Sequence, residues 1–173
     1  QGDSLIKEDG ERIKSAIVES GFRFPKGKIV CNLSPAQIKK KGSQIELAIA
    51  IAILAETGQI DRRLLAKTGF FGELTLSGRL VPCPGLIPIA NALKEQGVDK
   101  IIVADGTKEP LELIAQTKFV ASDLAQVIEA INSGQIVDNS SGASAFVAPP
   151  APALDFDQVR GQAEAKRAIT IAS

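Results

Sequence analysis

Apolar and polar residues follow two rhythms along this chain, and each rhythm predicts one kind of secondary structure. A repeat near 3.6 residues predicts helices, and alternation with a period of two predicts strands. Helices are predicted over residues 4–20, 46–56, 85–96, 109–115 and 123–132, with a short helical turn over 61–67. Strands are predicted over residues 28–33, 100–103 and 118–121, with a hairpin whose turn lies at 77–78. Helices and strands alternate, which indicates an α/β fold.

The predicted helices have the apolar faces and the ends that buried helices need. The first helix has one apolar face, made of Ile6, Ile13, Ala16 and Ile17, and it stops at a glycine. Residues 46–56, ELAIAIAILAE, are apolar nearly all round, so we expect this helix to be buried. Ser122 is the predicted N-cap of the last helix, with Asp123 in its first turn.

Residues 69–86, GFFGELTLSGRLVPCPGL, carry the most specific local signals. Apolar and polar side chains alternate over residues 71–76, as expected of a strand with one buried face. Gly78 permits a tight turn because glycine adopts positive φ without a steric cost. Pro82 and Pro84 end the second strand and lead into the helix that begins near Gly85.

The composition is that of an ordinary globular protein, with 45% apolar and 23% charged residues. Twenty basic and twenty acidic residues cancel, so the net charge favours neither nucleic acid nor membrane as a partner. The chain has no histidine, which excludes a histidine-based catalytic triad. Cys31 and Cys83 lack the spacing of a zinc site, and we expect both to be thiols in the core.

The chain shows no membrane-directed segment, and its composition changes after residue 132. No apolar run reaches about 18 residues and there is no signal peptide, so we expect a cytoplasmic protein. Residues 133–153 are rich in Ser, Gly, Ala and Pro, which predicts an interdomain linker. Residues 154–173 regain helical spacing but have nothing of their own to pack against. We therefore expect them to begin a second domain of a longer protein.

Several blocks of sequence together resemble one family. They are ERIKSAIVESGFRFP, NLSPAQIKKKGSQIELAIAIAILAETGQI, GELTLSGRLVPCPGLIPIANALKEQG and IIVADG, all within residues 10–132, and the tail FDQVRGQAEAKRAITIA. Their residues and order resemble the N-terminal, magnesium-chelatase-like domain of the ComM/YifB family of bacterial AAA+ ATPases. The resemblance implies a Lon-protease-type fold (ribosomal-protein-S5 domain-2-like superfamily) over residues 1–132, without its first strands. It also implies that residues 154–173 begin the AAA+ module.

Members of this family are linked to DNA branch migration in transformation and recombination. The resemblance therefore implies a longer protein that forms a homo-hexameric ring and uses ATP and Mg²⁺. Val159, Arg160 and Gly161 match the turn that lines the adenine pocket of such ATPases. This chain has no phosphate loop: residues 21–28 have the wrong glycine spacing, and Ile29 stands where a Ser or Thr would hold magnesium. We expect no cofactor in this chain alone.

The rival hypothesis is a Ser–Lys peptidase of the Lon type. Aligned on that family's glycines, Gln44 stands at the position of the nucleophilic serine and Ile87 at that of the lysine. An amide and an alkyl chain cannot perform acyl transfer. Ser43 lies one residue away, but Lys94 lies about two helical turns past the required place. The resemblance thus implies no catalytic residue here, and Ser43 is predicted to cap the helix that starts near residue 45.

Two basic segments have open interpretations. Lys39, Lys40 and Lys41 form a run on a predicted loop, which is either solvated or in contact with DNA phosphates or a partner. Arg62 and Arg63 carry the same ambiguity. The chain contains no Trp or Tyr, so the lysine run has no interleaved aromatic side chains for base stacking.

Glu46 and Glu73 could be mistaken for an acid/base pair, but glutamates at a helix start or in a strand are more often capping or surface residues. We therefore interpret the chain as a non-enzymatic accessory or docking module of an AAA+ motor. Two alternatives stay open: a Lon-type peptidase and a magnesium-chelatase-type ATPase chaperone subunit. Family members of the chelatase type generally lack a Lon-type domain ahead of the ring.

Overall fold

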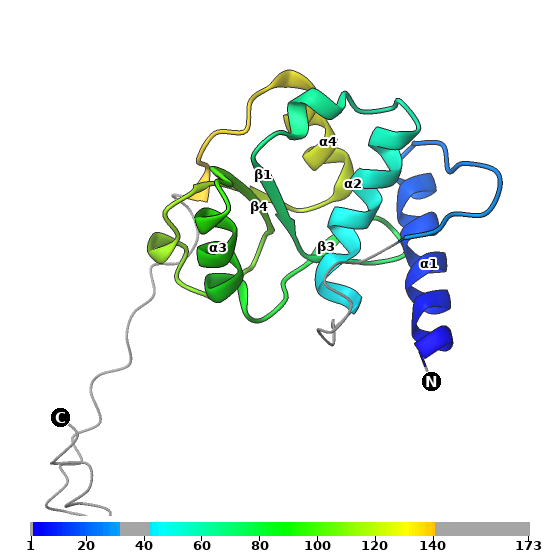
Figure 1. Cartoon of the computed structure of the whole chain (residues 1–173), viewed down its shortest axis with the longest axis horizontal. Helices are drawn as coiled ribbons and strands as arrows, with labels where there is room; N and C mark the ends of the chain where they lie inside the picture. The colour runs from blue at the N-terminus through cyan, green and yellow to red at the C-terminus, as the bar shows by residue number, and fades with distance from the viewer. Residues whose placement is uncertain (1, 32–41, 141–173) are drawn as a thin grey trace, which may run out of the picture.

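The structure is a computed structural model and describes residues 2–31 and 42–140. In chain order its elements are α1 (Gly2–Glu19), the 3₁₀ turn η1 (Gly42–Ile45), α2 (Glu46–Glu56), η2 (Arg62–Leu65), β1 (Thr68–Phe71), β2 (Glu73–Leu74), β3 (Leu80–Val81), α3 (Leu86–Glu95), β4 (Lys100–Ala104), η3 (Leu111–Leu113), β5 (Thr117–Ala121) and α4 (Leu124–Ser133). Figure 1 shows them as one α/β domain, which confirms the α/β part of the predicted fold class.

A three-stranded parallel sheet in the order β1-β4-β5 forms the centre of the domain. The register pairs Thr68 with Lys100 and Lys100 with Thr117. The last four residues of β4, IIVA, are all buried, as expected for a strand covered on both faces. The hairpin β2–β3 is a separate antiparallel pair in which Leu74 faces Leu80. The hairpin prediction is therefore confirmed.

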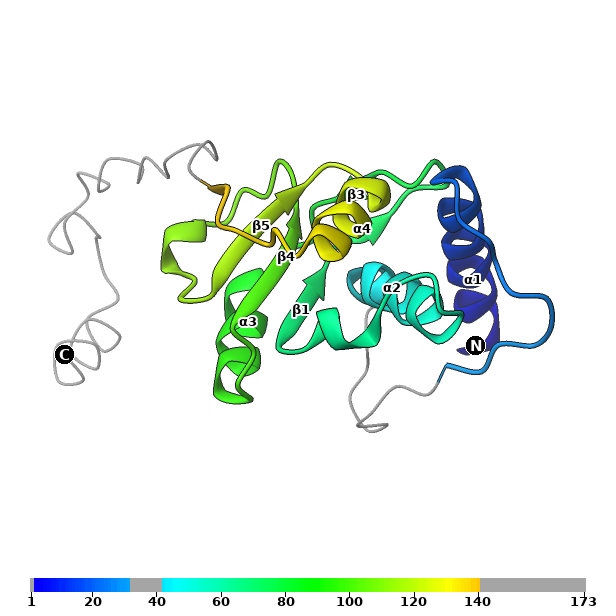
Figure 2. The same cartoon turned by 90° about the horizontal axis from the view of Figure 1, so that it is seen from above.

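Helices cover both faces of the sheet. On one face, Ile102 and Phe119 pack into a cluster with apolar residues of α1, α2 and α4. On the other face, Ile101 and Val103 pack with Phe71 and with residues of α3 and η3. The two views place α1 and α3 at opposite ends of the domain, with α2 next to α1 (Figures 1 and 2). The buried helix predicted over residues 46–56 is confirmed as α2.

The strand predicted over residues 28–33 is wrong where the structure describes it. Residues 28–31 form no strand, and the Val30 side chain is 77% exposed. Ile29 and Val30 instead line an apolar pocket together with Ile53 of α2 and form no backbone ladder. Cys31 is exposed, which corrects its assignment to the core.

The alternation over residues 71–76 merges two strands that point into different clusters. Phe71 ends β1 and is buried on the α3 side, whereas Leu74 belongs to the hairpin and is buried on the other side. Gly72 separates them, so the phase changes there, and Leu76 is exposed. The parallel strand β1 was therefore missed, because its four residues look like the start of the hairpin.

Two predictions near the C-terminal half need correction. The helix predicted over residues 109–115 is only the 3₁₀ turn η3, since Leu111 and Ile114 are drawn into the core just before β5 begins. The N-cap of α4 is Asp123, whose Oδ1 accepts a hydrogen bond from the Gln126 N–H at 2.8 Å. Ser122 is the residue before the cap, and its backbone N–H donates to Gln126 Oε1.

The first residues of the predicted linker lie along the outer edge of β5. Ile136 is buried. The Asn139 side chain accepts from the Val120 N–H at 2.6 Å and donates to the Val120 carbonyl at 2.9 Å. Asp138 pairs with Lys118 at 3.0 Å. Burial acts to raise the pKa of Asp138, but hydrogen bonds from Ser140 and Lys118 outweigh it and bring the pKa to about 2. Residues 141–173, with the rest of the linker and the predicted second domain, lie outside the described residues.

Replacing Gly78 by alanine is expected to lower the free energy of unfolding by about 2–4 kcal/mol. Gly78 has φ +79°, and an added Cβ would meet Ser20 Oγ and lie 3.1 Å from the Ala16 carbonyl oxygen. Gly58→Ala is the matched control, because φ is +70° there but nothing lies within 4 Å of the new Cβ. We expect the control to lose about 1–2 kcal/mol from backbone strain alone. Urea unfolding measures both, and equal losses would contradict the packing of the hairpin turn on α1.

Candidate functional site

The N-terminus of α3 is held by the carboxylate of Glu109. Glu109 Oε1 accepts from the N–H groups of Gly85 at 2.7 Å and Leu86 at 2.9 Å, and Oε2 accepts from that of Ile87 at 3.0 Å. A helix leaves its first N–H groups without partners inside the helix, and a negative charge is favourable there. Burial acts to raise the pKa of Glu109, but the three backbone donors together outweigh it and leave the pKa below its usual range.

The structure places Gln44 beside the start of α3, the helix that contains Ile87, the other residue aligned above with a Lon-type catalytic position. Gln44 lies in η1, and its Nε2 donates to the Pro84 carbonyl oxygen at 2.8 Å. Pro84 directly precedes the N-cap of α3, and Ile87 lies in the first turn of that helix. Two backbone hydrogen bonds, Gly72 N–H to Gln44 O and Leu47 N–H to Gly72 O, fix η1 beside β1. Gln44 is therefore tied to the residue that precedes the N-cap of α3, the helix that contains Ile87.

The groups at this place have no acyl-transfer chemistry. The Gln44 amide is engaged with backbone, and the Ile87 side chain packs against the apolar cluster under α3. Ser43 is part of η1 and does not cap α2: the N-cap is Ile45, without a side-chain hydrogen bond. Lys94 lies in the last turn of α3 and pairs with Asp99 at 3.4 Å. No hydroxyl and amine meet here among the residues that the structure describes.

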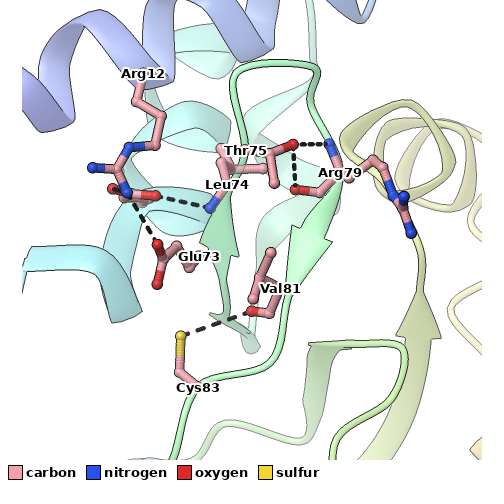
Figure 3. A network of polar contacts seen from close by, with 8 residues as sticks. Arg12, Glu73, Leu74, Thr75, Arg79, Val81 and Cys83 are labelled. Atoms are coloured by element: carbon pink, nitrogen blue, oxygen red, sulfur yellow. Dashed lines mark hydrogen bonds and ion pairs between the residues drawn. The ribbon is translucent and has the colours of Figure 1, made fainter.

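A second polar group joins α1, α2 and β2. Glu46 is fully buried, its Oε2 accepts from the Leu74 N–H at 2.8 Å, and its Oε1 lies 3.3 Å from Arg12 NH1. The same guanidinium donates to Glu73 Oε1 at 3.0 Å, and Figure 3 shows Arg12 reaching from α1 toward Glu73 and Leu74. The expectation that Glu46 is a surface or capping residue is wrong, because it is a buried partner of Arg12.

This network is structural and offers no acid/base pair. Both carboxylates face one guanidinium, which offers N–H donors and no acceptor. Glu46 also uses its second oxygen on a backbone N–H of the hairpin. The arrangement ties the N-terminal helix to the hairpin through a side chain of α2.

The two cysteines have different surroundings. Cys83 is buried between the proline residues, with its Sγ 3.8 Å from the Val81 carbonyl oxygen. Burial raises the pKa of the Cys83 thiol, and the nearby carboxylates of Glu73 and Glu46 act in the same direction. A thiol with a raised pKa is a poor nucleophile. The prediction of a core thiol is confirmed for Cys83 alone.

The sequence-predicted contact residues fall into two groups. Lys39, Lys40 and Lys41, and the adenine-pocket residues Val159, Arg160 and Gly161, lie outside the described residues. Arg62 and Arg63 are described, and acidic neighbours hold both. Arg62 pairs with Glu56 at 2.8 Å, and Arg63 with Asp61 at 2.8 Å.

Sequence reasoning missed Glu109 and Arg12, the two charged residues that organise these sites. Glu109 follows the strand β4 in the segment DGTKEP, which carries no helix-capping signal because its target lies 22 to 24 residues earlier in the chain. Arg12 sits in a polar stretch of α1 that resembles any solvated helix face. Neither contact has a local sequence signature.

Comparisons with known proteins give one consistent family. The sequence pattern described as "Subunit ChlI of Mg-chelatase" matches residues 1–107. The competence protein ComM of Haemophilus influenzae is 32% identical over 174 residues, which cover 99% of this chain and 34% of ComM. YifB of Escherichia coli is 34% identical over 169 residues, covering 98% of this chain and 33% of YifB. A Lon protease of Lachnoclostridium phytofermentans is 31% identical over 94 residues, 54% of this chain and 11% of that protease.

The chain spans about one third of the length of the curated relatives it matches. A search for membrane-spanning helices among the described residues found none with the length and apolarity to cross a bilayer.

Arg12→Met is expected to lower the free energy of unfolding by about 2–3 kcal/mol. Removing one partner of a fully buried ion pair costs about 3–5 kcal/mol, and Arg12 is partly exposed, which reduces the loss. Lys14→Met is the matched control, since Lys14 lies on the same helix and, among the described residues, pairs only with the exposed Glu11. That control should change stability by less than about 0.5 kcal/mol. Denaturant unfolding distinguishes them, and a loss no larger than the control's would show that Arg12 does not hold Glu46.

Glu109→Gln is expected to lower the free energy of unfolding by about 1–2 kcal/mol at pH 7, because the helix loses a charged acceptor. The folded-state pKa of Glu109 is lowered, so its contribution is present above the unfolded-state pKa of about 4.3 and is lost as pH falls through the folded-state value. The difference between wild type and variant should therefore shrink between pH 5 and pH 3. Glu112→Gln, at an exposed position, is the control for each measurement.

Proposed function

The chain belongs to the family of the ChlI subunit of Mg-chelatase, and from this membership we propose that it is the non-proteolytic N-terminal domain of a ComM-like AAA+ ATPase. The observation that carries the proposal is the match to ComM and YifB over nearly the whole chain, tail included. The fold is in keeping with it, because the α/β domain has a parallel sheet and its last helix, α4, ends at Ser133, where the predicted linker begins.

The domain serves the longer protein as an accessory or docking module and carries no reaction of its own. The motor would be the AAA+ module that begins within residues 154–173, with ATP and Mg²⁺ bound there and Val159, Arg160 and Gly161 at its adenine pocket. It would form a homo-hexameric ring in the cytoplasm and couple ATP hydrolysis to DNA branch migration in transformation and recombination. ComM is named a competence protein, which supports this role.

The main alternative is a Ser–Lys peptidase, which the partial match to a Lon protease favours. The contacts of the aligned residues disfavour a peptidase. The Gln44 amide donates a hydrogen bond to the Pro84 carbonyl oxygen, and Ile87 is an alkyl side chain packed against the apolar cluster. A magnesium-chelatase-type chaperone subunit is the other alternative, favoured by the family description. The Lon-type domain proposed ahead of the ring disfavours it.

DNA is the proposed substrate, and Lys39, Lys40 and Lys41 are the contact predicted from sequence. Three lysines neutralise at most about three phosphates, so the binding should be weak and sensitive to salt. A partner protein docked on the same run is the competing role.

The 173-residue chain is expected to bind a labelled branched DNA in the micromolar range at low salt, and the triple change Lys39/Lys40/Lys41→Ala should abolish that binding. A salt titration by fluorescence anisotropy measures both, with circular dichroism to confirm that the variant is folded. If the wild-type chain binds no DNA at low salt, the DNA contact belongs to the ATPase ring and this domain is a docking module only.

A further inference from the structure

The basic residues of this neutral chain are unevenly placed. Residues 20–45 contain no Asp or Glu, whereas six Lys and Arg residues fall within them. The structure describes the first part of this stretch, which we call the cationic loop and define as residues 21–28. Its charged residues are Arg23, Lys26 and Lys28, and all three are exposed. None of the three has an ion-pair partner among the residues that the structure describes.

The backbone of the cationic loop is held at Arg23, and the charged side chains of the loop are exposed. The Gln59 amide brackets Arg23: the Arg23 N–H donates to Gln59 Oε1 at 2.8 Å, and Gln59 Nε2 donates to the Arg23 carbonyl at 2.7 Å. Gln59 is itself oriented by Thr57 Oγ1 at 2.8 Å, beyond the end of α2. Phe22 and Phe24 flank Arg23 and pack against the main core. The backbone at Arg23 is therefore fixed, and the three charged side chains are exposed to solvent.

Arg62 and Arg63, the other basic segment described, have the opposite arrangement. Each guanidinium is held by an acidic side chain at 2.8 Å, Glu56 for Arg62 and Asp61 for Arg63. Their positive charge is neutralised within the protein, so they add little to the field outside it. Of these two basic segments, the cationic loop is the one whose charges have no ion-pair partner among the described residues.

We propose that the cationic loop is a contact surface for the phosphate backbone of nucleic acid, with Arg23, Lys26 and Lys28 as its phosphate-binding residues. This rests on the proposed DNA-handling function and deepens it. A chain of six residues extends at most about 20 Å, so the three cations fall within the span of about six consecutive phosphates of one strand. Phe22 and Phe24 pack against the core and are not available to stack on bases. The proposed contact therefore depends on phosphate charge and not on base sequence.

An acidic polypeptide is the competing partner, because an apolar pocket of about 180 Å³ lies beside the loop, between Pro25, Val30 and Ile53. Glu56 also lines that pocket, and its carboxylate disfavours an acidic segment seated there. Nucleic acid would contact the exposed cations alone and would not have to occupy the pocket. The observations therefore favour nucleic acid.

The test uses the 173-residue chain with Lys39–Lys41 intact and compares Arg23/Lys26/Lys28→Ala with Arg62/Arg63→Ala. The probe is a labelled branched DNA, titrated from 50 to 200 mM salt. We expect the loop variant to bind at least 10-fold more weakly at 50 mM salt, with a slope of log K against log salt shallower by about 2 to 3. The control variant should match wild type in both. Because Gln59 holds the backbone of Arg23, the loop variant should remain folded, which circular dichroism checks.

Three results would overturn the inference: wild-type chain that binds no DNA, a loop variant that binds as tightly as the control, or polyglutamate of equal charge that competes as well as DNA. The proposed function is tested apart from it, by ATP-driven branch migration of the longer ATPase. If the DNA-binding results overturn the inference but the longer ATPase still drives branch migration, the proposed function stands. Absent branch migration, together with loop-dependent DNA binding, removes the motor's proposed role and keeps the loop as a nucleic-acid contact.

Discussion

The domain depends on side chains that satisfy backbone groups far away in the sequence. A parallel sheet of three strands has few ladder hydrogen bonds, and every helix end and strand edge beside it needs partners for its N–H and C=O groups. Amide and carboxylate side chains supply these partners over separations of 19 to 40 residues: Gln44, Glu46, Gln59, Glu109, Gln116 and Asn139. Each fastens one segment of the chain to another. The apolar clusters supply the cohesion, and these contacts fix how the segments are placed.

Local signals were sufficient for the elements whose reason lies within their own residues. The helix at 46–56 is buried because it is apolar all round, and the turn at Gly78 forms because glycine adopts its φ without strain. The same reasoning failed where the conformation of a segment depends on a partner that is distant in the sequence. Val30 belongs to an apolar, strand-like run, but it lies beside α2 and pairs with no strand.

The candidate site shows the same division. The identities of Gln44 and Ile87, read against the family pattern, predict that the serine and lysine of the Lon type are missing at these two positions. The reason that the place keeps its shape was not predictable, since the Glu109 carboxylate arrives from beyond β4. In this arrangement Gln44 still links η1 to the start of α3, as a structural tie between two segments. The scaffold at this place is maintained by contacts that need no reactive group.

Asn139 has a consequence for where the folded unit can be cut. Its amide occupies both backbone groups of Val120, the residue in the outer strand of the sheet. An open strand edge is a template on which other chains assemble, and proteins cover or interrupt such edges for that reason. Composition alone would end the domain at residue 132, which would strip this cover and leave β5 bare. The seven residues that look like the beginning of a spacer thus carry the cover of this sheet edge, and a folded unit that keeps the edge covered has to include them.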